Sequence, residues 1–457
     1  MNRDDELIDP LFALSSSDGR YFRRVDNLRE IFSEYGLIKK RVFVEIKWFL
    51  FITKKLNIKI NKDKAIKLEE KLNNFSIYDA KRIKEIEKTT NHDVKAVEYF
   101  LKEIYDENDS EFIHFGLTSE DVNNLSYALN LKEYIEKIFD ENIKGLMNIL
   151  KKLAFDYKDK PMLSRTHGQP ATPTTFGKEI SYYLKRIYDT YKRIKSIEIC
   201  GKLNGATGNF ASFYISYPEI DWIDLSKEFI ESLGIKQNIV TIQIEPHDFI
   251  ARILNEFSIL DGILVDLAKD VWLYISYEYL KLKSVKTEVG SSTMPHKVNP
   301  IDFENGWGNF ETSQSLCQFL SRRLIVSMMQ RDLTDSTLLR NLSLCFSHFE
   351  IGLYSLIKGL EKIDLNEEKI ISDLQNYPEV LAEAIQTILR KNMIKNGYEM
   401  LKEFTRGKKV NLEILRDFIN KLDINPSDRE KLINLTPENY TGLSAKIVEK
   451  VLKEVVF

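Results

Sequence analysis

Residues 247–280 read "HDFIARILNEFSILDGILVDLAKDVWLYISYEYL", and this stretch decides the fold. Its apolar residues recur at steps of three and four, as on one face of a helix: Ile250, Leu254, Phe257, Leu260, Leu264, Leu267, Val271 and Ile275. A helix of about 34 residues, rising about 1.5 Å per residue, would be about 50 Å long. Such a length exceeds that of an ordinary globular helix and indicates a bundle or an oligomer core.

Proline placement extends this interpretation to much of the chain. The 11 prolines leave residues 11–160, 247–294 and 301–377 free of proline. Because proline is excluded from helix interiors, these gaps permit very long helices. Residues 124–157 and 174–199 repeat the helical spacing of apolar residues. We therefore predict an all-α fold.

Three domains are expected from the lengths of the periodic segments. Residues 1–115 should form an N-terminal helical domain, and residues 116–365 a central bundle of long helices. Residues 366–457 have shorter periodic segments that three prolines interrupt, so a small C-terminal helical domain is expected there.

Composition limits the classes of function. The formal net charge of −3 argues against a broad nucleic-acid surface. The three cysteines match no zinc spacing and suit free thiols in a reducing compartment. The first ten residues lack the apolar core of a signal peptide, and no run approaches the about 18 apolar residues that span a bilayer. We expect a cytoplasmic protein that binds neither nucleic acid nor a membrane.

Polar residues gather where helices are expected to begin. In "KTTNHDVKAVEYFL" (88–101), Thr90 and Asp93 have capping-box spacing, which places Asn91 and His92 in a first turn. Free backbone N–H groups in such a turn favour anions.

The same spacing recurs in "GLTSEDVNNLSYAL" (116–129), where Thr118 and Asp121 form the pair. Thr118 and Ser119 are therefore expected at a second helix start.

Two further stretches carry histidines beside turn residues. In "LSRTHGQPATPTTFGKEI" (163–180), His167 lies in a Gly/Pro-rich turn, and Pro173 suits the first turn of the next helix. In "TIQIEPHDF" (241–249), Gln243 and His247 come at or just before the start of the longest helix.

Two predicted loops carry further candidate binding residues. "QRDLTDSTLLRN" (330–341) offers guanidinium and hydroxyl groups at spacings that can clamp a phosphate: Arg331, Ser336, Thr337 and Arg340. "GSSTMPHKVNP" (290–300) carries hydroxyls, an imidazole, an ammonium and an amide, more than a plain connection requires. That loop is typical of a reactive or anion-binding segment.

Each of these residues also has a purely structural interpretation. A capping Thr or Ser is usually only a cap, and His247 could stabilise a helix start. His114 and His348 fall in apolar stretches and suit core or surface positions, while Arg331 and Arg340 could be ion-pair partners. Yet five of the six histidines lie in or beside turn-rich segments. This concentration favours a functional site over a bare helical scaffold.

These motifs resemble the fumarase/aspartase superfamily of lyases, whose signature loop the 290–300 stretch matches. Within it, the chain is most similar to the bacterial-type branch of the adenylosuccinate lyase family, over residues 15 to about 410. His296 favours this branch, because the similar argininosuccinate lyases usually carry Gln there. The resemblance implies a β-elimination that releases fumarate from adenylosuccinate to leave AMP, and from SAICAR to leave AICAR. It implies neither a cofactor nor a metal.

The reaction needs a base, an acid and donors for a carboxylate that gains charge. By motif match, Ser291 is the general base and His167 the general acid. A serine can act so only if the loop and Lys297 hold it as an alkoxide. From the residues alone, a histidine, His296 first, would be the expected base. His92 is expected to position the phosphate end or to orient His167.

Substrate contacts follow from the same match. Arg20 and Tyr21 in "SSSDGRY" suit phosphate and ribose, and Gln243 suits a carboxylate. The full set of expected binding residues is Arg20, Tyr21, Asn91, His92, Asp93, Thr118, Ser119, Gln243, Ser292, Lys297, Val298, Asn299, Arg331, Ser336, Thr337 and Arg340.

Two alternatives remain at this stage. One is another lyase of the superfamily, such as argininosuccinate lyase, and the other is a non-catalytic helical scaffold. A scaffold would be expected to have lost Ser291, His167 or Lys297, and the chain keeps all three. The resemblance further implies a homotetramer in which each active site draws on three chains.

Overall fold

The computed structural model describes residues 13–283, 294, 297–405 and 410–457. It divides into two compact units. The first contains residues 1–143, 190–264 and 306–354, and the second contains residues 144–189, 265–305 and 355–457. This division follows contacts rather than chain order, so the three sequential domains proposed above stay a prediction.

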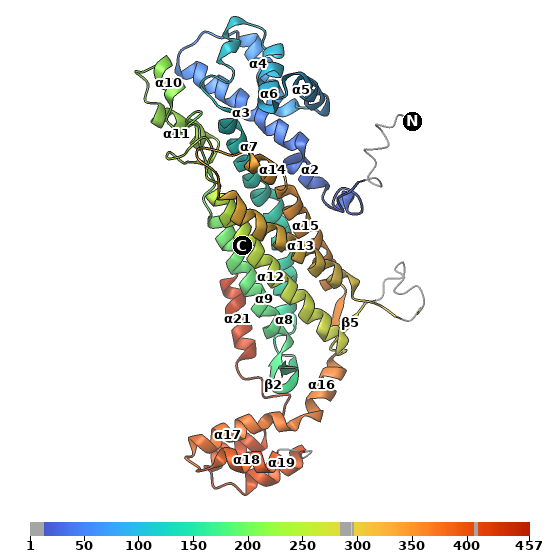
Figure 1. Cartoon of the computed structure of the whole chain (residues 1–457). Coiled ribbons are helices and arrows are strands. Elements are labelled where there is room, and N and C mark those ends of the chain that lie inside the picture. The colour runs from blue at the N-terminus through green and yellow to red at the C-terminus, as the bar shows by residue number, and fades with distance from the viewer. Residues whose placement is uncertain (1–12, 284–293, 295–296, 406–409) are drawn as a thin grey trace. The chain divides into compact units, whose positions relative to one another are not determined.

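The first unit opens with short helices and continues into longer ones (Figure 1). Its N-terminal elements are η2 (Phe22–Arg24), α2 (Asp26–Phe32), α3 (Glu34–Lys55), α4 (Lys62–Asn74), α5 (Ile77–Thr90), α6 (Asp93–Ile104) and η3 (Asn108–Phe112). Its later elements are α7 (Ser119–Glu133), the π-helical turn η4 (Tyr134–Phe139), β3 (Cys200–Gly201), α10 (Ala211–Ser216), α11 (Trp222–Ser232), β4 (Lys236–Gln237) and α14 (Thr334–Leu339).

Five long helices contribute residues to both units. They are α8 (Asp140–Asp156), α9 (Phe176–Ser196), α12 (Asp248–Ser276), α13 (Ile301–Leu324) and α15 (Leu342–Leu360). The second unit adds β1 (Pro161–Thr166), β2 (Gln169–Thr175), β5 (Leu280–Leu282), β6 (Ile363–Leu365), α16 (Glu367–Asn376), η5 (Pro378–Leu381), α17 (Ala382–Lys391), α18 (Gly397–Thr405), α19 (Leu412–Asn420), α20 (Pro426–Ile433) and α21 (Ser444–Glu454).

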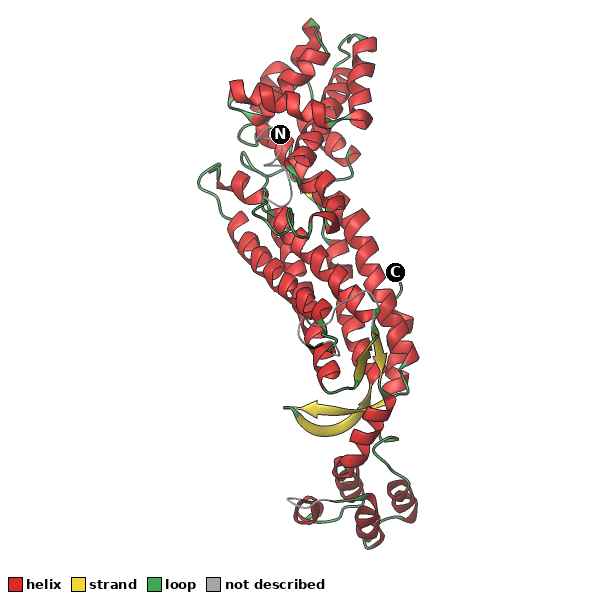
Figure 2. Ribbon diagram, turned by 90° about the vertical axis from the view of Figure 1, so that its right-hand side faces the viewer, coloured by secondary structure: helices red, strands yellow, loops and turns green. Residues whose placement is uncertain are grey.

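The described residues are therefore mostly helical, with short strands that pair two by two, drawn in yellow in Figure 2. β1–β2 and β5–β6 are antiparallel pairs, and β3–β4 is a parallel pair. The helical prediction is confirmed, but the sequence did not indicate the strands. The Thr, Pro and Ser residues of β1 and β2 suit a loop, and the other strands have only two or three residues, too few to show a period.

Helix α12 follows the expected stripe of apolar residues. It begins at Asp248 and runs 29 residues to Ser276, so the predicted end near Leu280 lies too far along. The stripe is buried from Ile250 to Val271. Around Phe257 it meets aromatic rings from other helices, namely Tyr134, Phe139, Phe346 and Phe349, with centroids 4.9 to 6.0 Å away. This packing explains why the helix can be so long in one piece.

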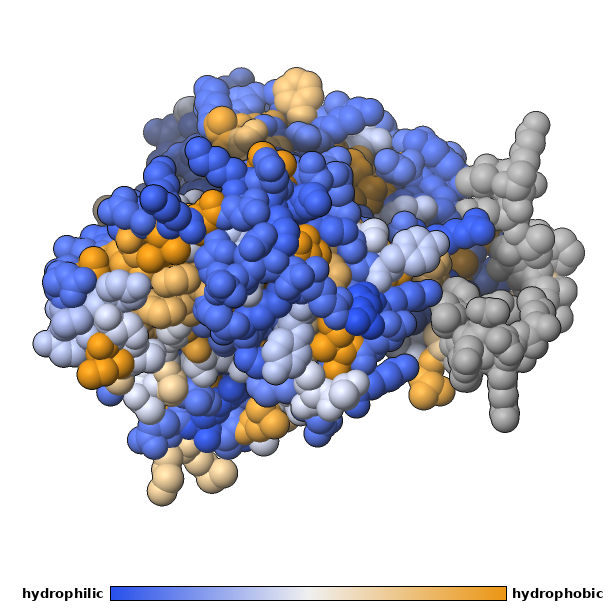
Figure 3. Space-filling view, turned by 90° about the horizontal axis from the view of Figure 1, so that it is seen from above, coloured by the Kyte–Doolittle hydropathy of each residue, from blue (hydrophilic) through white to orange (hydrophobic). Residues whose placement is uncertain are grey.

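Two smaller apolar cores occupy the ends of the chain. One lies in the first unit between α3, α4, α5 and α6 and includes Phe49, Leu68, Val97 and Tyr105. The other lies in the second unit among α17 to α20 and includes Ile385, Leu389, Leu415 and Ile419. Outside these cores, hydrophilic residues predominate on the face drawn in Figure 3, and hydrophobic residues form separate patches there. Among the described helices, we find none long and apolar enough to cross a membrane.

Two histidines have structural partners in the first unit. The imidazole Nδ1 of His114 lies 2.6 Å from Oε1 of the buried Glu45 carboxylate. Burial by itself would lower the pKa of His114, but Glu45 outweighs burial and the pKa is raised. His348 approaches Asn309 at 2.9 Å, and burial lowers its pKa.

These opposite shifts predict opposite pH dependences of stability. The His114 contribution should be fully present below the unfolded pKa of about 6.5 and lost as the pH rises through the raised folded value. We expect His114→Gln to lower the free energy of unfolding by about 1.5–3 kcal/mol at pH 5.5, and by clearly less at pH 9. Urea unfolding at the two pH values measures this difference.

His348→Gln serves as the matched control. Its lowered pKa makes its contribution full above about pH 6.5 and smaller below. The His348→Gln loss should therefore be greater at pH 9 than at pH 5.5. Equal losses for His114→Gln at both pH values would contradict the charge pair.

Candidate functional site

Helix α7 starts on a capping box, as predicted. Thr118 is the N-cap, and its backbone N–H donates to Oδ2 of Asp121 at 2.8 Å. Asp121 is fully buried, and its oxygens also accept from Asn204 N at 3.0 Å and Gly205 N at 3.2 Å. Lys202 Nζ, equally buried, lies 3.0 Å from Oδ1. One carboxylate therefore joins the start of α7 to the segment that follows β3.

Helix α6 starts differently from the prediction. Asn91, in the left-handed region at φ 49°, ends α5, and His92 is itself the N-cap of α6. The pattern at Thr90 suggested a helix start, but α5 continues through Thr90. His92 Nδ1 accepts from Lys95 N at 3.1 Å, an unusual role for an imidazole.

This cap directs the other ring nitrogen toward α7. His92 Nε2 lies 3.4 Å from the Ser119 hydroxyl, so two motifs 27 residues apart meet at two helix starts. Both side chains reach solvent. The imidazole and the hydroxyl lie beside the N-terminal, positive ends of the α6 and α7 helix dipoles, a setting that suits an anion.

Asp93 connects the start of α6 to the end of helix α14. Its Oδ2 lies 2.7 Å from Arg41 and 3.4 Å from Arg340. Burial alone would raise the pKa of Asp93, but the two guanidinium groups outweigh it and the pKa is lowered. Arg340 also donates from Nη1 to the Ser336 hydroxyl at 2.7 Å. Thr337, on the same helix, is exposed.

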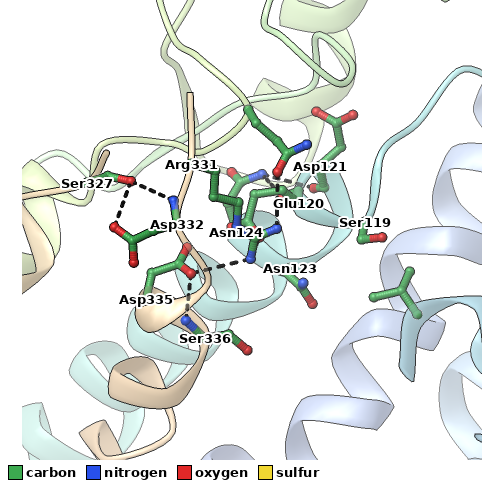
Figure 4. A network of polar contacts seen from close by, with 12 residues as sticks. Ser119, Glu120, Asp121, Asn123, Asn124, Ser327, Arg331, Asp332, Asp335 and Ser336 are labelled. Carbon is green, nitrogen blue, oxygen red and sulfur yellow. Dashed lines mark hydrogen bonds and ion pairs between the residues drawn. The ribbon is translucent and has the colours of Figure 1, made fainter. Parts of the chain in front are cut away.

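Arg331 lies at the centre of a buried charged network (Figure 4). Its Nη2 is 3.0 Å from Glu120 Oε2 and 3.4 Å from Asp335 Oδ1. Its Nη1 approaches Gln243 Oε1 at 3.5 Å, the outer limit of a hydrogen bond. Burial raises the pKa of Glu120 to about 7, against the opposing effects of Arg331 and His247.

His247 also belongs to this network. It lies just before α12, in the position that the sequence predicted. It is 2% exposed, and its backbone is left-handed at φ 62°, an uncommon conformation for a residue other than glycine. Its N–H donates to Glu245 at 2.8 Å, and Nε2 lies 3.6 Å from Asp335 Oδ2. That distance exceeds the usual range of a hydrogen bond.

In the second unit, His167 occupies the tip of the β1–β2 hairpin. Thr166 pairs with Gln169, so His167 and Gly168 form a two-residue turn, with φ of 55° and 73°. Positive φ at both positions is the mark of a type I′ turn, which matches the twist of paired strands. His167 is exposed at this tip. Pro173 lies in β2, not in the first turn of α9 as predicted, because α9 begins at Phe176.

The signature loop is described only in part. Lys297 and Val298 are exposed and Asn299 is half-buried, all in the second unit. Lys297 N donates to Met294 O at 3.0 Å. Ser291, Ser292 and His296 lie outside the described residues.

The remaining expected contacts lie near the start of the chain. Arg20 is exposed, and its guanidinium lies 5.9 Å from the centre of the Tyr21 ring. Tyr21 N donates to Ser16 O at 2.9 Å, which fixes the turn before α2.

The first unit thus brings together most of the residues predicted from its segments. They are Asn91, His92, Asp93, Thr118, Ser119, Gln243, Arg331, Ser336 and Arg340. Asn91 and Thr118 belong to the set as chain neighbours of His92 and Ser119, and the others take part in the contacts above. Sequence reasoning missed Glu120, Asp335 and Lys202, whose burial gives them their importance. Within the described residues, no group of three or more His, Cys, Asp or Glu side chains could hold a metal ion.

Comparison with known proteins identifies the family. Residues 19–311 match the family described as "Lyase", and residues 327–441 match "Adenylosuccinate lyase C-terminal". Adenylosuccinate lyase of Escherichia coli (strain K12) is 47% identical over 450 residues, covering 96% of this chain and 99% of the relative. This chain belongs to the adenylosuccinate lyase family. The resemblance predicted from the motifs is confirmed.

Other members of the adenylosuccinate lyase family agree in length as well as sequence. The enzyme of that name from Haemophilus influenzae (strain ATCC 51907 / DSM 11121 / KW20 / Rd) is 46% identical over 450 residues, covering 96% of this chain and 99% of the relative. Among solved structures, a fumarate lyase from Mesorhizobium sp. BNC1 superimposes with a TM-score of 0.76 at 19% identity, covering 94% of this chain and 97% of that one. The fold is that of the fumarate lyases, and the chain is an enzyme of the lyase class.

The buried Asp121–Lys202 pair makes a stability prediction for this family member. Asp121→Asn removes the negative charge but keeps the shape, so the Lys202 ammonium stays buried without compensation. We expect the free energy of unfolding to fall by about 3–5 kcal/mol. Chemical denaturation at pH 7 measures this loss.

Two variants control the interpretation. Glu136→Gln, which breaks an exposed pair with Lys132 at 2.8 Å, should cost less than about 1 kcal/mol. Adding Lys202→Met to Asp121→Asn should recover part of the loss, because no unpaired charge then remains buried. An Asp121→Asn protein as stable as the wild type would disprove the role of the pair.

Proposed function

We propose that this chain cleaves adenylosuccinate to AMP and fumarate, and cleaves SAICAR to AICAR and fumarate in the same way. The observation that carries the proposal is the 47% identity with the Escherichia coli adenylosuccinate lyase over 96% of the chain. Both reactions are β-eliminations that break a C–N bond. They need proton transfer and charge stabilisation from the protein, and we propose that no metal or cofactor takes part.

The first chemical requirement is removal of a proton from the carbon beside a carboxylate. The negative charge then spreads into a group that is already anionic, so donors must face it. We assign this role to Lys297, Asn299, Thr118 and Ser119. We assign removal of the proton to Ser291, which its loop would hold as an alkoxide. His296 stays the alternative base.

The second requirement is a proton for the leaving nitrogen. We assign it to His167, because an imidazole can exchange protons near neutral pH. The type I′ turn supports this assignment, since it presents the ring at the exposed tip of a hairpin. A two-residue turn between paired strands fixes the position of that tip more firmly than a long loop would.

The third requirement is recognition of a nucleotide with a phosphate and two carboxylates. The cluster of the first unit supplies cations, hydroxyls and helix starts for these anions. We assign the phosphate and ribose to Arg20, Tyr21, Ser336, Thr337 and Arg340, with His92, Asn91 and Asp93 beside them. Gln243, Arg331, Ser292 and Val298 complete the proposed set.

The direct test uses the purified wild-type protein. Incubation with adenylosuccinate should release fumarate and AMP in equal amounts, and incubation with SAICAR should release fumarate and AICAR. Argininosuccinate is the control substrate and should be left intact. Failure to release fumarate from either purine ribotide would refute the proposed function.

Two single variants separate the acid from the base. We expect His167→Ala to lose most turnover while substrate affinity stays within about tenfold, as when a transition-state interaction is removed. Ser291→Ala should fold and bind adenylosuccinate without cleaving it. Steady-state and binding measurements decide. If His296→Ala is inactive while Ser291→Ala keeps its activity, the base is the histidine.

We further propose that the protein works as a homotetramer in the cytoplasm, with each active site built from three chains. Long helices support this assembly, because helices from several copies can bring different ends together. The three cysteines, described as free thiols, suit a reducing compartment.

Shared sites predict complementation between inactive variants. When His167→Ala and Ser291→Ala proteins are dissociated, mixed in equal amounts and reassembled, about a quarter of wild-type activity should return if the two residues come from different chains. Size-exclusion chromatography should show an assembly of four chains. Hybrid tetramers that stay inactive would mean that both residues come from one chain.

A further inference from the structure

Arg331 is held by two carboxylates that approach the same nitrogen. Glu120 from α7 reaches Nη2 at 3.0 Å, and Asp335 from α14 reaches it at 3.4 Å. Figure 4 shows the guanidinium between the two elements. Asp335 is itself fixed, because its Oδ1 accepts from Ser336 N at 2.7 Å. The Nη1 end is less engaged, with Gln243 Oε1 at 3.5 Å.

Solvent cannot substitute for these partners. The Glu120 side chain is 1% exposed and the Asp335 side chain 8%, while Arg331 is 15% exposed. Glu120 Oε1, Arg331 Nε and Asp335 Oδ2 are buried without a hydrogen-bond partner among the described residues. Because Glu120 and Asp335 are buried, water has little access to the Nη2 side of the guanidinium, and its direction depends on these carboxylates.

We propose that Glu120 is a positioning residue, which fixes the Arg331 guanidinium so that its Nη1 end is presented to the substrate. The inference rests on the proposed function, in which Arg331 contacts the substrate. Glu120 does not itself touch the substrate. It acts through Arg331, because its carboxylate occupies Nη2 and thereby sets the rotation of the guanidinium plane.

The ionisation of Glu120 gives this role a pH signature. The charged groups that face Glu120 are Arg331, His247 and Lys202, which favour its ionised form, and Asp335, which opposes it. Only the ionised carboxylate holds Arg331 firmly. With the pKa of Glu120 raised to about 7 by burial, its contribution to substrate binding should be lost as the pH falls through about 7.

The test is Glu120→Gln, which keeps the shape of the side chain and removes its charge. We expect KM for adenylosuccinate to rise about thirtyfold at pH 8, with kcat within about threefold, because an interaction that orients a binding group is lost. We expect the wild type to lose kcat/KM as the pH falls through about 7, and the part of that loss that comes from Glu120 should be absent from the variant. Thermal denaturation of the same preparations verifies folding.

Glu133→Gln is the matched control on the same helix. Glu133 pairs with Lys40 at 2.6 Å and Lys137 at 2.9 Å, and no described contact links it to Arg331. Its kinetics and pH profile should equal those of the wild type. If Glu120→Gln does not fold, Glu120→Asp replaces it, and it should raise KM by a smaller factor while keeping the pH dependence.

A double-mutant cycle with Arg331→Gln decides whether Glu120 acts through Arg331. Once Arg331 is neutral, adding Glu120→Gln should change kcat/KM by less than about twofold. Losses that multiply in the double variant, or wild-type kinetics in a folded Glu120→Gln or Glu120→Asp protein, would overturn the inference. A wild-type protein that releases no fumarate from adenylosuccinate would instead overturn the proposed function, and this inference with it.

Discussion

Four donors converge on the Asp121 carboxylate where helix α7 begins. Two are backbone N–H groups of Asn204 and Gly205, one is the N–H of Thr118, and one is the Lys202 ammonium. The geometry leaves no oxygen of this buried group unmatched. It also sets the position of Ser119 and Glu120, which precede Asp121 on the same turn. The contacts that Ser119 and Glu120 make with His92 and Arg331 therefore depend on a single satisfied charge.

Glu120, next to Asp121 in the chain, begins a series of neighbouring charged groups. Glu120 faces Arg331, Arg331 faces Asp335, and Asp335 faces His247. The Arg331 guanidinium lies beside the carboxylates of Glu120 and Asp335, which lowers the cost of keeping these charges away from water. Several atoms of the network nevertheless have no hydrogen-bond partner among the residues that the structure describes. Unpaired polar atoms in a buried network are expensive, and they are typical of sites whose polar groups serve a reaction rather than stability.

The sequence predicted the scaffold better than the ends of its elements. The apolar stripe of α12 was readable because eight residues repeat one period, and a long repeat outweighs local exceptions. The start of α6 was misplaced because Thr90 imitates a cap, while the left-handed turn at Asn91 depends on backbone geometry that residue types only suggest. The hairpin at His167 was missed for a related reason. His-Gly is a suitable pair for a type I′ turn, but the strands PMLSRT and QPATPTT show no alternation of apolar and polar residues.

The sequence predicted those residues of the candidate site that belong to a recognisable motif. It did not predict those whose importance comes from their burial. Arg331, Gln243 and Ser119 were found from their motifs. Glu120 and Asp335 looked like ordinary acids of a helix start, since both occupy first turns where acids are common. Only the fold shows that one guanidinium lies between them. Charge pairing across elements distant in sequence leaves no periodic trace, so no spacing rule could have found it.

The π-helical turn at Tyr134–Phe139 has a consequence for how this chain can vary. In an α-helix, residues five apart point about 140° away from each other, at about 100° per residue. Here Tyr134 and Phe139 are both fully buried, and their ring centroids are 6.4 Å apart. The wider turn absorbs one extra residue and resets the rotational phase of the helix that follows. The π-turn thus sets the rotational offset between the polar start of α7 and the aromatic core beyond it, and removing one residue from this turn would rotate one relative to the other.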